Sequence, residues 1–147
     1  MTGRPTHKDP VALLLIGLGG ALGTGIRSLL EQGHPAPSGG WPWTTFAINV
    51  TGAFVLGALL EGLSRSGPDT GWRRRARLTL GTGVLGGYTT YSTLAVETVG
   101  ITTLTHPLTG PAYAVASVVL GVLASAGGFL LVRGIARHRP TSSLAAR

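Results

Sequence analysis

The chain has 147 residues, enough for a single domain. Hydrophobic residues make up 44% and charged residues only 12%, with a mean hydropathy of +0.34, which argues against an ordinary soluble domain and indicates a membrane protein. The absence of cysteine excludes disulfides and thiolate metal sites, whereas the meaning of the net charge of +7 depends on where the charges lie.

The first predicted helix covers residues 11–30 and follows a basic N-terminal segment, residues 1–10, that carries Arg4 and Lys8. A signal peptide has the same charge pattern, but this apolar stretch is longer than a signal-peptide core and lacks a small-x-small cleavage site at its end. We therefore expect a retained membrane helix. A second apolar segment, residues 43–63, predicts another.

The third apolar segment covers residues 78–104, which is longer than the ~20 residues that a bilayer requires. The fourth covers residues 111–132 and is followed by a polar tail, residues 133–147. The connections between segments are rich in glycine, proline, serine and arginine, as turns are. The sequence thus predicts an all-α membrane domain with four transmembrane helices, residues 11–132.

Two short motifs resemble binding sites of other protein classes, but the sequence around each motif argues against that interpretation. LIGLGGALGTGIR resembles the glycine turn of a dinucleotide-binding fold, but its third glycine falls one residue late and no acidic residue follows at the ribose position. WRRRAR resembles a nucleic-acid patch, but its place between two membrane spans favours a cytoplasmic loop. We expect no nucleic-acid partner.

Small residues recur four positions apart, a spacing typical of helices that pack closely in membranes. Tight packing alone explains most of them. The stripes are Gly19 and Gly23, Gly83 and Gly87, and Ser117, Gly121 and Ser125.

Polar side chains inside a membrane span are costly unless they are paired, so each one requires an explanation. Arg27, near the end of the first span, either reaches the interface or pairs with Glu31 one turn on. Asn49 lies in the second span, with Thr45 one turn before it. Its amide can hydrogen-bond another helix or donate to an anion, and the sequence leaves both open.

The later spans carry few polar groups. Tyr113 and Ser117 lie four apart on one face of the fourth span, where packing is the simpler explanation, and Glu97 could simply face an aqueous vestibule. The four histidines lie in tails and loops, so no nucleophile and base can be assembled and the sequence argues against an enzyme. The first span also lacks the mid-membrane carboxylate that a small four-helix proton-coupled exporter would need.

The segment GVLGGYTTYST, residues 83–93, is the least helical part of an apolar span. Its glycine and threonine pairs predict a helix broken near its middle, and a break is tolerated in lipid only where it lines a cavity or is buried in protein. Freed carbonyl oxygens suit Na⁺-like cations. Hydroxyl groups, the Asn49 amide and aromatic ring edges can instead face an anion.

Three segments, GGALGTGIR, TTFAINVTGAFVLG and GVLGGYTTYSTLAVE, resemble the Fluc (CrcB) fluoride channels, and the resemblance covers roughly residues 10–132. It implies a passive fluoride-selective channel of the cell (inner) membrane that exports the anion from the cytoplasm and lowers its toxicity. It also implies an antiparallel dimer with two fluoride pathways and one structural Na⁺ at the dimer centre. The implied Na⁺ ligands are the backbone carbonyls of Gly86 and Thr89.

The resemblance also assigns side chains to the fluoride pathway. Arg27 and Glu97 fall on positions that the family uses, as vestibule or structural residues. The assigned pathway residues are Asn49, Thr45, Tyr91, Ser92, Thr93, Tyr113 and Ser117.

The chain departs from the family pattern at three positions. Two pore phenylalanines correspond to Tyr91 and Leu94 here, and a serine of the fourth helix corresponds to Gly121. Tyr91 keeps a ring edge and adds a hydroxyl, whereas Leu94 has no positive edge. Either a partner supplies the complete pathway or conduction is altered. A pore-defective assembly subunit is therefore the alternative function, with a small cation or drug exporter third.

The charges of the loops predict the orientation of the chain. Every Lys and Arg except Arg27 falls in the N-terminal segment, in the loop between the second and third spans or in the C-terminal segment. These three segments share one side when the number of spans is even, and that side is predicted to be the cytoplasm. A chain so biased inserts one way only. An antiparallel dimer then requires a second, homologous chain of opposite orientation, so we predict a heterodimer in the lipid bilayer.

Overall fold

The structure, a computed structural model, describes residues 8–137. Within them every regular element is helical, which confirms the all-α prediction. Most of the predicted basic N-terminal segment, and the tail beyond Arg137, lie outside the described residues.

Three long helices correspond to the first, second and fourth predicted spans. They are α1 (Pro10–Gly33), α2 (Trp43–Ser66) and α6 (Thr109–Arg137), and each is long and apolar enough to cross a membrane. Asp9 caps α1 by accepting hydrogen bonds from the backbone N–H groups of Val11 (3.2 Å) and Ala12 (3.3 Å). Helix α6 continues to Arg137, into the segment that the sequence predicted as tail.

The third predicted span is a series of helical pieces. It begins with α3 (Gly71–Ala76), ahead of residue 78, and continues as the π-helix η2 (Arg77–Leu85) and the short α4 (Gly86–Tyr88). After a non-helical stretch, α5 (Ser92–Leu104) completes it. The break near the middle is confirmed. The π-helix was not predicted, because the glycines and threonines that permit its wider turn also occur in ordinary membrane helices.

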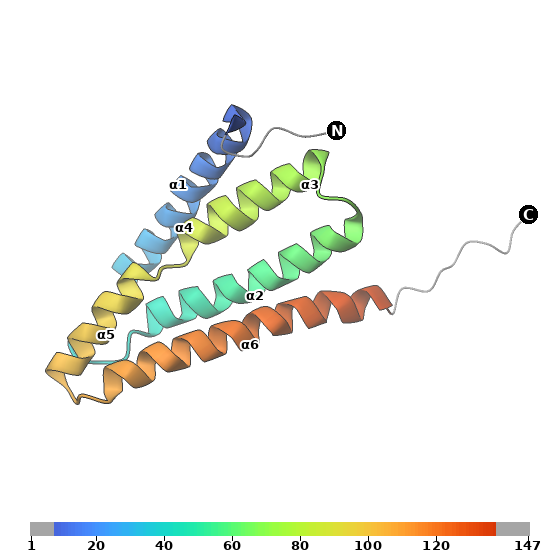
Figure 1. Ribbon diagram of the computed structural model, residues 1–147. Helices are drawn as coiled ribbons and strands as arrows, with labels where there is room; N and C mark the ends of the chain where they lie inside the picture. The colour runs from blue at the N-terminus through green and yellow to red at the C-terminus, as the bar shows by residue number, and fades with distance from the viewer. Residues whose placement is uncertain (1–7, 138–147) are drawn as a thin grey trace, which may run out of the picture.

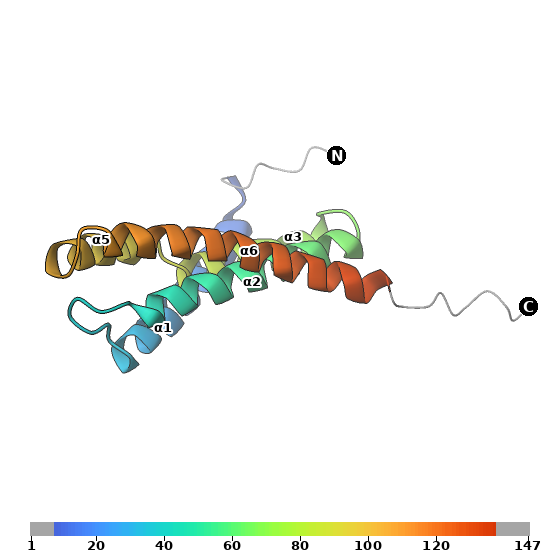
Figure 2. The same cartoon turned by 90° about the horizontal axis from the view of Figure 1, so that it is seen from below.

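The break changes the packing partner of the chain. Before it, η2 and α4 lie against α1, and after it α5 lies against α6, which also packs along the length of α2 (Figures 1 and 2). The molecule therefore consists of one layer with α1, η2 and α4 and another with α2, α5 and α6, and residues 89–91 carry the third span from the first layer to the second. At the break, α2 contacts both α4 and α5.

Glycines make the contact between α1 and the η2–α4 segment possible. A Cβ on Gly23 would collide with the backbone carbonyl oxygen of Val84, and one on Gly19 would lie 2.5 Å from the carbonyl oxygen of Thr79. Packing explains these glycines, as predicted. Gly121 differs, because a Cβ there would have no neighbour within 4 Å.

The chain buries few large apolar side chains on its own. The buried cluster consists of Leu94, Ile101 and Tyr113, with Trp41 and Phe46 packed against it. Most leucines and valines of α1 and α6 are exposed, for example Leu14 at 61%. Such surfaces suit lipid or another subunit rather than water.

Candidate functional site

Asn49 joins α2 to the break in the third span. Its Oδ1 accepts a hydrogen bond from the Thr90 backbone N–H (2.8 Å), and its Nδ2 donates to the Thr90 carbonyl (3.0 Å). The backbone N–H and C=O of Thr90, which lies in the break, are thereby both hydrogen-bonded by a single side chain. The structure thus shows Asn49 hydrogen-bonding another segment, while one amide hydrogen is left for a further acceptor.

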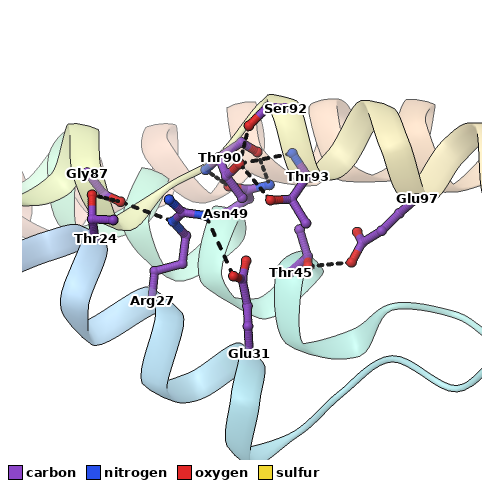
Figure 3. A network of polar contacts seen from close by, with 10 residues as sticks. All are labelled: Thr24, Arg27, Glu31, Thr45, Asn49, Gly87, Thr90, Ser92, Thr93 and Glu97. Atoms are coloured by element: carbon purple, nitrogen blue, oxygen red, sulfur yellow. Dashed lines mark hydrogen bonds and ion pairs between the residues drawn. The ribbon is translucent and has the colours of Figure 1, made fainter.

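A cluster of hydroxyl groups follows directly on the chain. The Thr90 Oγ1 donates to Thr93 Oγ1 (3.0 Å), accepts from the Thr93 backbone N–H (3.1 Å) and lies 3.3 Å from Ser92 Oγ. Thr90 is buried, and its hydroxyl accepts a hydrogen bond from a backbone N–H in the first turn of α5. Because Thr93 accepts from Thr90, its own hydroxyl hydrogen remains available. Figure 3 shows this group gathered beside Asn49.

The carbonyl oxygens around the break fall into two groups. That of Leu85 accepts from Thr89, and that of Gly87 accepts from Thr24 Oγ1 (3.4 Å) and Arg27 Nε (3.2 Å). In contrast, the carbonyls of Gly86, Tyr88 and Thr89 accept no hydrogen bond from any described residue. Backbone oxygens of this kind are ligands for hard cations. Side chains offer no substitute, since the described residues contain no group of three or more His, Cys, Asp or Glu suited to a metal.

Arg27 connects α1 to the same region. Besides its bond to the Gly87 carbonyl, its Nη1 lies 3.6 Å from Glu31 Oε2 one turn further on. Of the two alternatives that the sequence left open, the structure shows the pairing with Glu31, and the guanidinium also binds the backbone of α4. The other oxygen of Glu31 is buried and has no hydrogen-bond partner among the described residues.

Glu97 is the centre of a buried chain of hydroxyl groups. Thr45 Oγ1 donates to Glu97 Oε1 and Tyr113 Oη donates to Glu97 Oε2, both at 2.7 Å. Ser117 Oγ donates in turn to the Tyr113 carbonyl (2.8 Å). Thr45, Tyr113 and Ser117 are all buried. Glu97 thus accepts hydrogen bonds from hydroxyl groups on α2 and α6. It is therefore not simply a carboxylate that faces water.

An open groove of about 400 Å³ runs along α2, the break and α6. It brings together Asn49, Tyr91 and Ser117 of the predicted pathway, with Thr89 and Thr90 beside them. The lining of the groove does not include Thr45, Tyr113, Ser92, Thr93 or Gly86. The predicted residues therefore lie partly along an open groove whose surface is mostly apolar and partly in the buried chain around Glu97, with Ser117 belonging to both.

The three departures from the family pattern all lie at this groove. Tyr91 is 81% exposed and extends from the break, whereas Leu94 is buried against Ile101 and Tyr113 while lining the groove wall. Gly121 leaves the wall of α6 open at its position. Leu94 thus belongs to the buried core, a role that its correspondence to a pore phenylalanine of the family did not suggest.

Sequence reasoning missed Thr90 and Thr24. Thr90 is the hub of the hydroxyl cluster and the partner of Asn49, and Thr24 donates to the Gly87 carbonyl. The signal for Thr90 was present in the Thr-Thr pair of residues 89–90, since threonine hydroxyls often accept hydrogen bonds from backbone N–H groups where a helix begins. Nothing in the sequence marked Thr24.

Comparisons with known proteins agree on one family. The family model for CrcB-like protein, Camphor Resistance (CrcB), matches residues 14–129. A fluoride-specific ion channel FluC 2 from Leifsonia xyli is 45% identical over 139 residues, 95% of each chain. A FluC 1 from Cutibacterium acnes is 51% identical over 116 residues, 79% of this chain and 81% of that protein. A FluC from Rhizobium meliloti is 39% identical over 128 residues, 84% of this chain and 97% of that protein.

Proposed function

This chain belongs to the CrcB family, and from that premise we propose that it forms a passive channel through which fluoride leaves the cytoplasm. The family is one of ion channels, so the chain is a multi-pass membrane protein and not an enzyme. One observation carries the proposal: an open groove between apolar membrane helices brings Asn49, Tyr91 and Ser117 together with the polar break of the third span.

The donors at the groove suit a small anion. Fluoride holds its water tightly, so a selective path must replace that water with several closely spaced hydrogen-bond donors. At the groove, Asn49 keeps one amide hydrogen and Tyr91 presents a hydroxyl and a ring edge. Thr93, in the hydroxyl cluster beside Asn49, keeps its hydroxyl hydrogen. We assign these residues and Ser92 as direct donors. Chloride, which is larger, cannot approach such a set as closely.

The buried chain around Glu97 plays a second part. Thr45 and Tyr113 already donate to the carboxylate, and Ser117 donates to a carbonyl, so their hydrogens are engaged in this state. We propose that a passing fluoride competes with Glu97 for the hydrogens of Thr45 and Tyr113, and with the Tyr113 carbonyl for that of Ser117. Until the anion arrives, Glu97 holds the hydroxyl groups of Thr45 and Tyr113 in a fixed orientation. Arg27 lies on the α1 side of the break, where its positive charge attracts the anion (Figure 3).

A structural Na⁺ fits the break. The carbonyls of Gly86 and Thr89 accept no hydrogen bond from the described residues, and Gly86 is exposed, so both are free to be shared with a partner subunit. Two oxygens are too few for Na⁺, and an antiparallel partner would supply the other two. When bound, the cation supplies a fixed positive charge that favours an anion nearby.

The assembly we propose is an antiparallel dimer with a second, homologous chain. The groove is open along one side, and Tyr91, which lines it, is 81% exposed, as expected of surfaces that a partner covers. The loop charges favour an orientation with both termini in the cytoplasm, so we propose that the partner carries the opposite bias.

Fluoride efflux from liposomes tests the function. Vesicles loaded with sodium fluoride and holding this chain, alone and together with a homologous chain of opposite charge bias, are followed with a fluoride-selective electrode. We expect fluoride efflux from the pair and negligible chloride efflux in a parallel experiment. Comparable rates for the two anions would contradict fluoride selectivity.

The same experiment addresses the alternative function, a pore-defective assembly subunit, which Leu94 and Gly121 favour. In that case the paired vesicles conduct, but changes at Asn49 and Tyr91 of this chain leave the flux unchanged. Proton-driven uptake of an organic cation would instead support the exporter.

A further inference from the structure

The groove continues along α6 past the residues already assigned to the fluoride pathway. Its α6 wall runs from Ser117 through Gly121 to Ser125, which is about 12 Å of helix. Between the two serines the lining is apolar, with Val118 and Val122 on α6 and Ala53 on α2. An anion that follows the groove beyond Ser117 therefore meets no other polar side chain of α6 until it reaches Ser125.

The hydroxyl of Ser125 differs from other hydroxyls of the helices because its hydrogen is not engaged. Serine and threonine within helices commonly donate to the carbonyl four residues earlier. Ser117 does so to Tyr113 at 2.8 Å, and Thr98 does so to Leu94 at 2.7 Å. Among the described residues, no hydrogen bond joins the Ser125 hydroxyl to any group, and the residue is only partly buried. Its hydrogen is therefore available to a ligand in the groove.

The position of Ser125 is fixed by the close contact between α2 and α6. A Cβ on Gly57 would collide with the carbonyl oxygen of Ser125 and would lie 3.0 Å from its Oγ. A Cβ on Gly128, one turn further along α6, would collide with the Phe54 carbonyl. The two backbones thus touch on both sides of one helical turn. A donor held on packed helices in this way needs little rearrangement to bind an anion.

Gly121 leaves the approach to Ser125 open. A Cβ at this position would have no neighbour within 4 Å, although the residue lines the groove between the two serines. Because glycine carries no side chain, nothing on this turn of α6 projects into the groove. An ion can therefore pass along the wall from Ser117 to Ser125.

We propose that Ser125 is a further hydrogen-bond donor to fluoride, at a second binding position on α6 beyond Ser117. This inference rests on the proposed channel function and adds a residue to it. In a mostly apolar stretch of groove, the Ser125 hydroxyl replaces part of the water that the anion has lost. The proton stays on the serine oxygen, since a serine hydroxyl is a much weaker acid than hydrogen fluoride.

Removal of the hydroxyl tests this role. Ser125→Ala keeps the Cβ at the contact with Gly57 and removes only the donor. In liposomes that hold the chain and its homologous partner, we expect fluoride efflux to fall about two- to tenfold, as for one lost hydrogen bond, with an unchanged size-exclusion profile. Ser66→Ala is the matched control, because that hydroxyl donates to the Gly62 carbonyl (2.8 Å) outside the groove. Its efflux should equal that of the wild type.

A second variant separates donation from packing. Gly121→Ser/Ser125→Ala returns a hydroxyl to the groove one turn away, at a position with room for a side chain. We expect it to recover at least about half of the lost efflux, which a packing role of Ser125 at Gly57 would not allow. Wild-type efflux in Ser125→Ala, loss of assembly in that variant, or no recovery in the double variant would overturn the role of Ser125 alone. Absence of fluoride efflux from the wild-type pair would instead refute the channel function, and this role with it.

Discussion

Asn49 combines two tasks in one side chain. It closes two hydrogen bonds to Thr90 and keeps one amide hydrogen for the groove. Asn49→Asp keeps the acceptor oxygen but places a negative charge where the amide donated, facing both the Thr90 carbonyl and the anion path. We expect fluoride flux to fall at least about tenfold, since an unpaired buried polar group already costs about 1–3 kcal/mol. Liposome efflux, with size-exclusion chromatography to monitor assembly, measures this. A variant that conducts normally would exclude Asn49 from the pathway.

Glu31 forms an ion pair with Arg27 beside the break. Its Oε2 lies 3.6 Å from the guanidinium, and its Oε1 has no hydrogen-bond partner among the described residues. Glu31→Gln leaves the attraction of Arg27 for fluoride unopposed, so initial efflux at low fluoride concentration should rise about two- to fivefold. Asp69→Asn is the matched control, because it removes a carboxylate from an ion pair in the α2–α3 connection, at the opposite end of the helices from Glu31. Slower efflux in Glu31→Gln, or the same rise in the control, contradicts this prediction.

At the scale of elements, α1 depends on its glycines for contact with η2 and α4. A side chain on Gly23 collides with the Val84 carbonyl, whereas one on Gly25 meets nothing within 4 Å. Gly23→Leu should therefore destabilise the fold by about 1–3 kcal/mol or more, and Gly25→Leu should be tolerated. Thermal unfolding in detergent, followed by circular dichroism, compares the two. Equal midpoints for both variants would show that α1 does not pack closely here.

The elements also show what a sequence can and cannot predict. The four spans and the break were predictable, because hydropathy sets the span lengths and the Gly-Gly and Thr-Thr pairs weaken the helix locally. The roles of Thr90 and Leu94 were not, because they depend on which segments the break brings together. Asn49 shows the limit most clearly: its two possible uses were both visible, but only its distance to Thr90 shows that the first is realised.

At the scale of the whole molecule, charge asymmetry predicts a single orientation. Ser38 lies exposed before α2 begins, and Ser66 lies exposed at its last residue, so the two mark opposite sides of the membrane. The chain has no cysteine, and single cysteines at these positions can be labelled in intact cells with a membrane-impermeant thiol reagent. We expect labelling at position 38 only, because the arginine-rich side stays in the cytoplasm. Equal labelling at both positions, with fluoride flux from this chain alone, would indicate a dual-topology homodimer.

The change of packing partner at residues 89–91 also restricts how the length of the chain can vary in evolution. One residue added there would lengthen the connection, so the bonds of Asn49 to Thr90 and the contacts of Leu94 and Glu97 with α6 could not all be kept while η2 stayed on α1. The turns at residues 34–42 and 105–108 connect whole helices and carry no such set of fixed contacts. Insertions and deletions among homologous genes should therefore accumulate in those turns and at the ends of the chain, and spare the few codons on either side of the break.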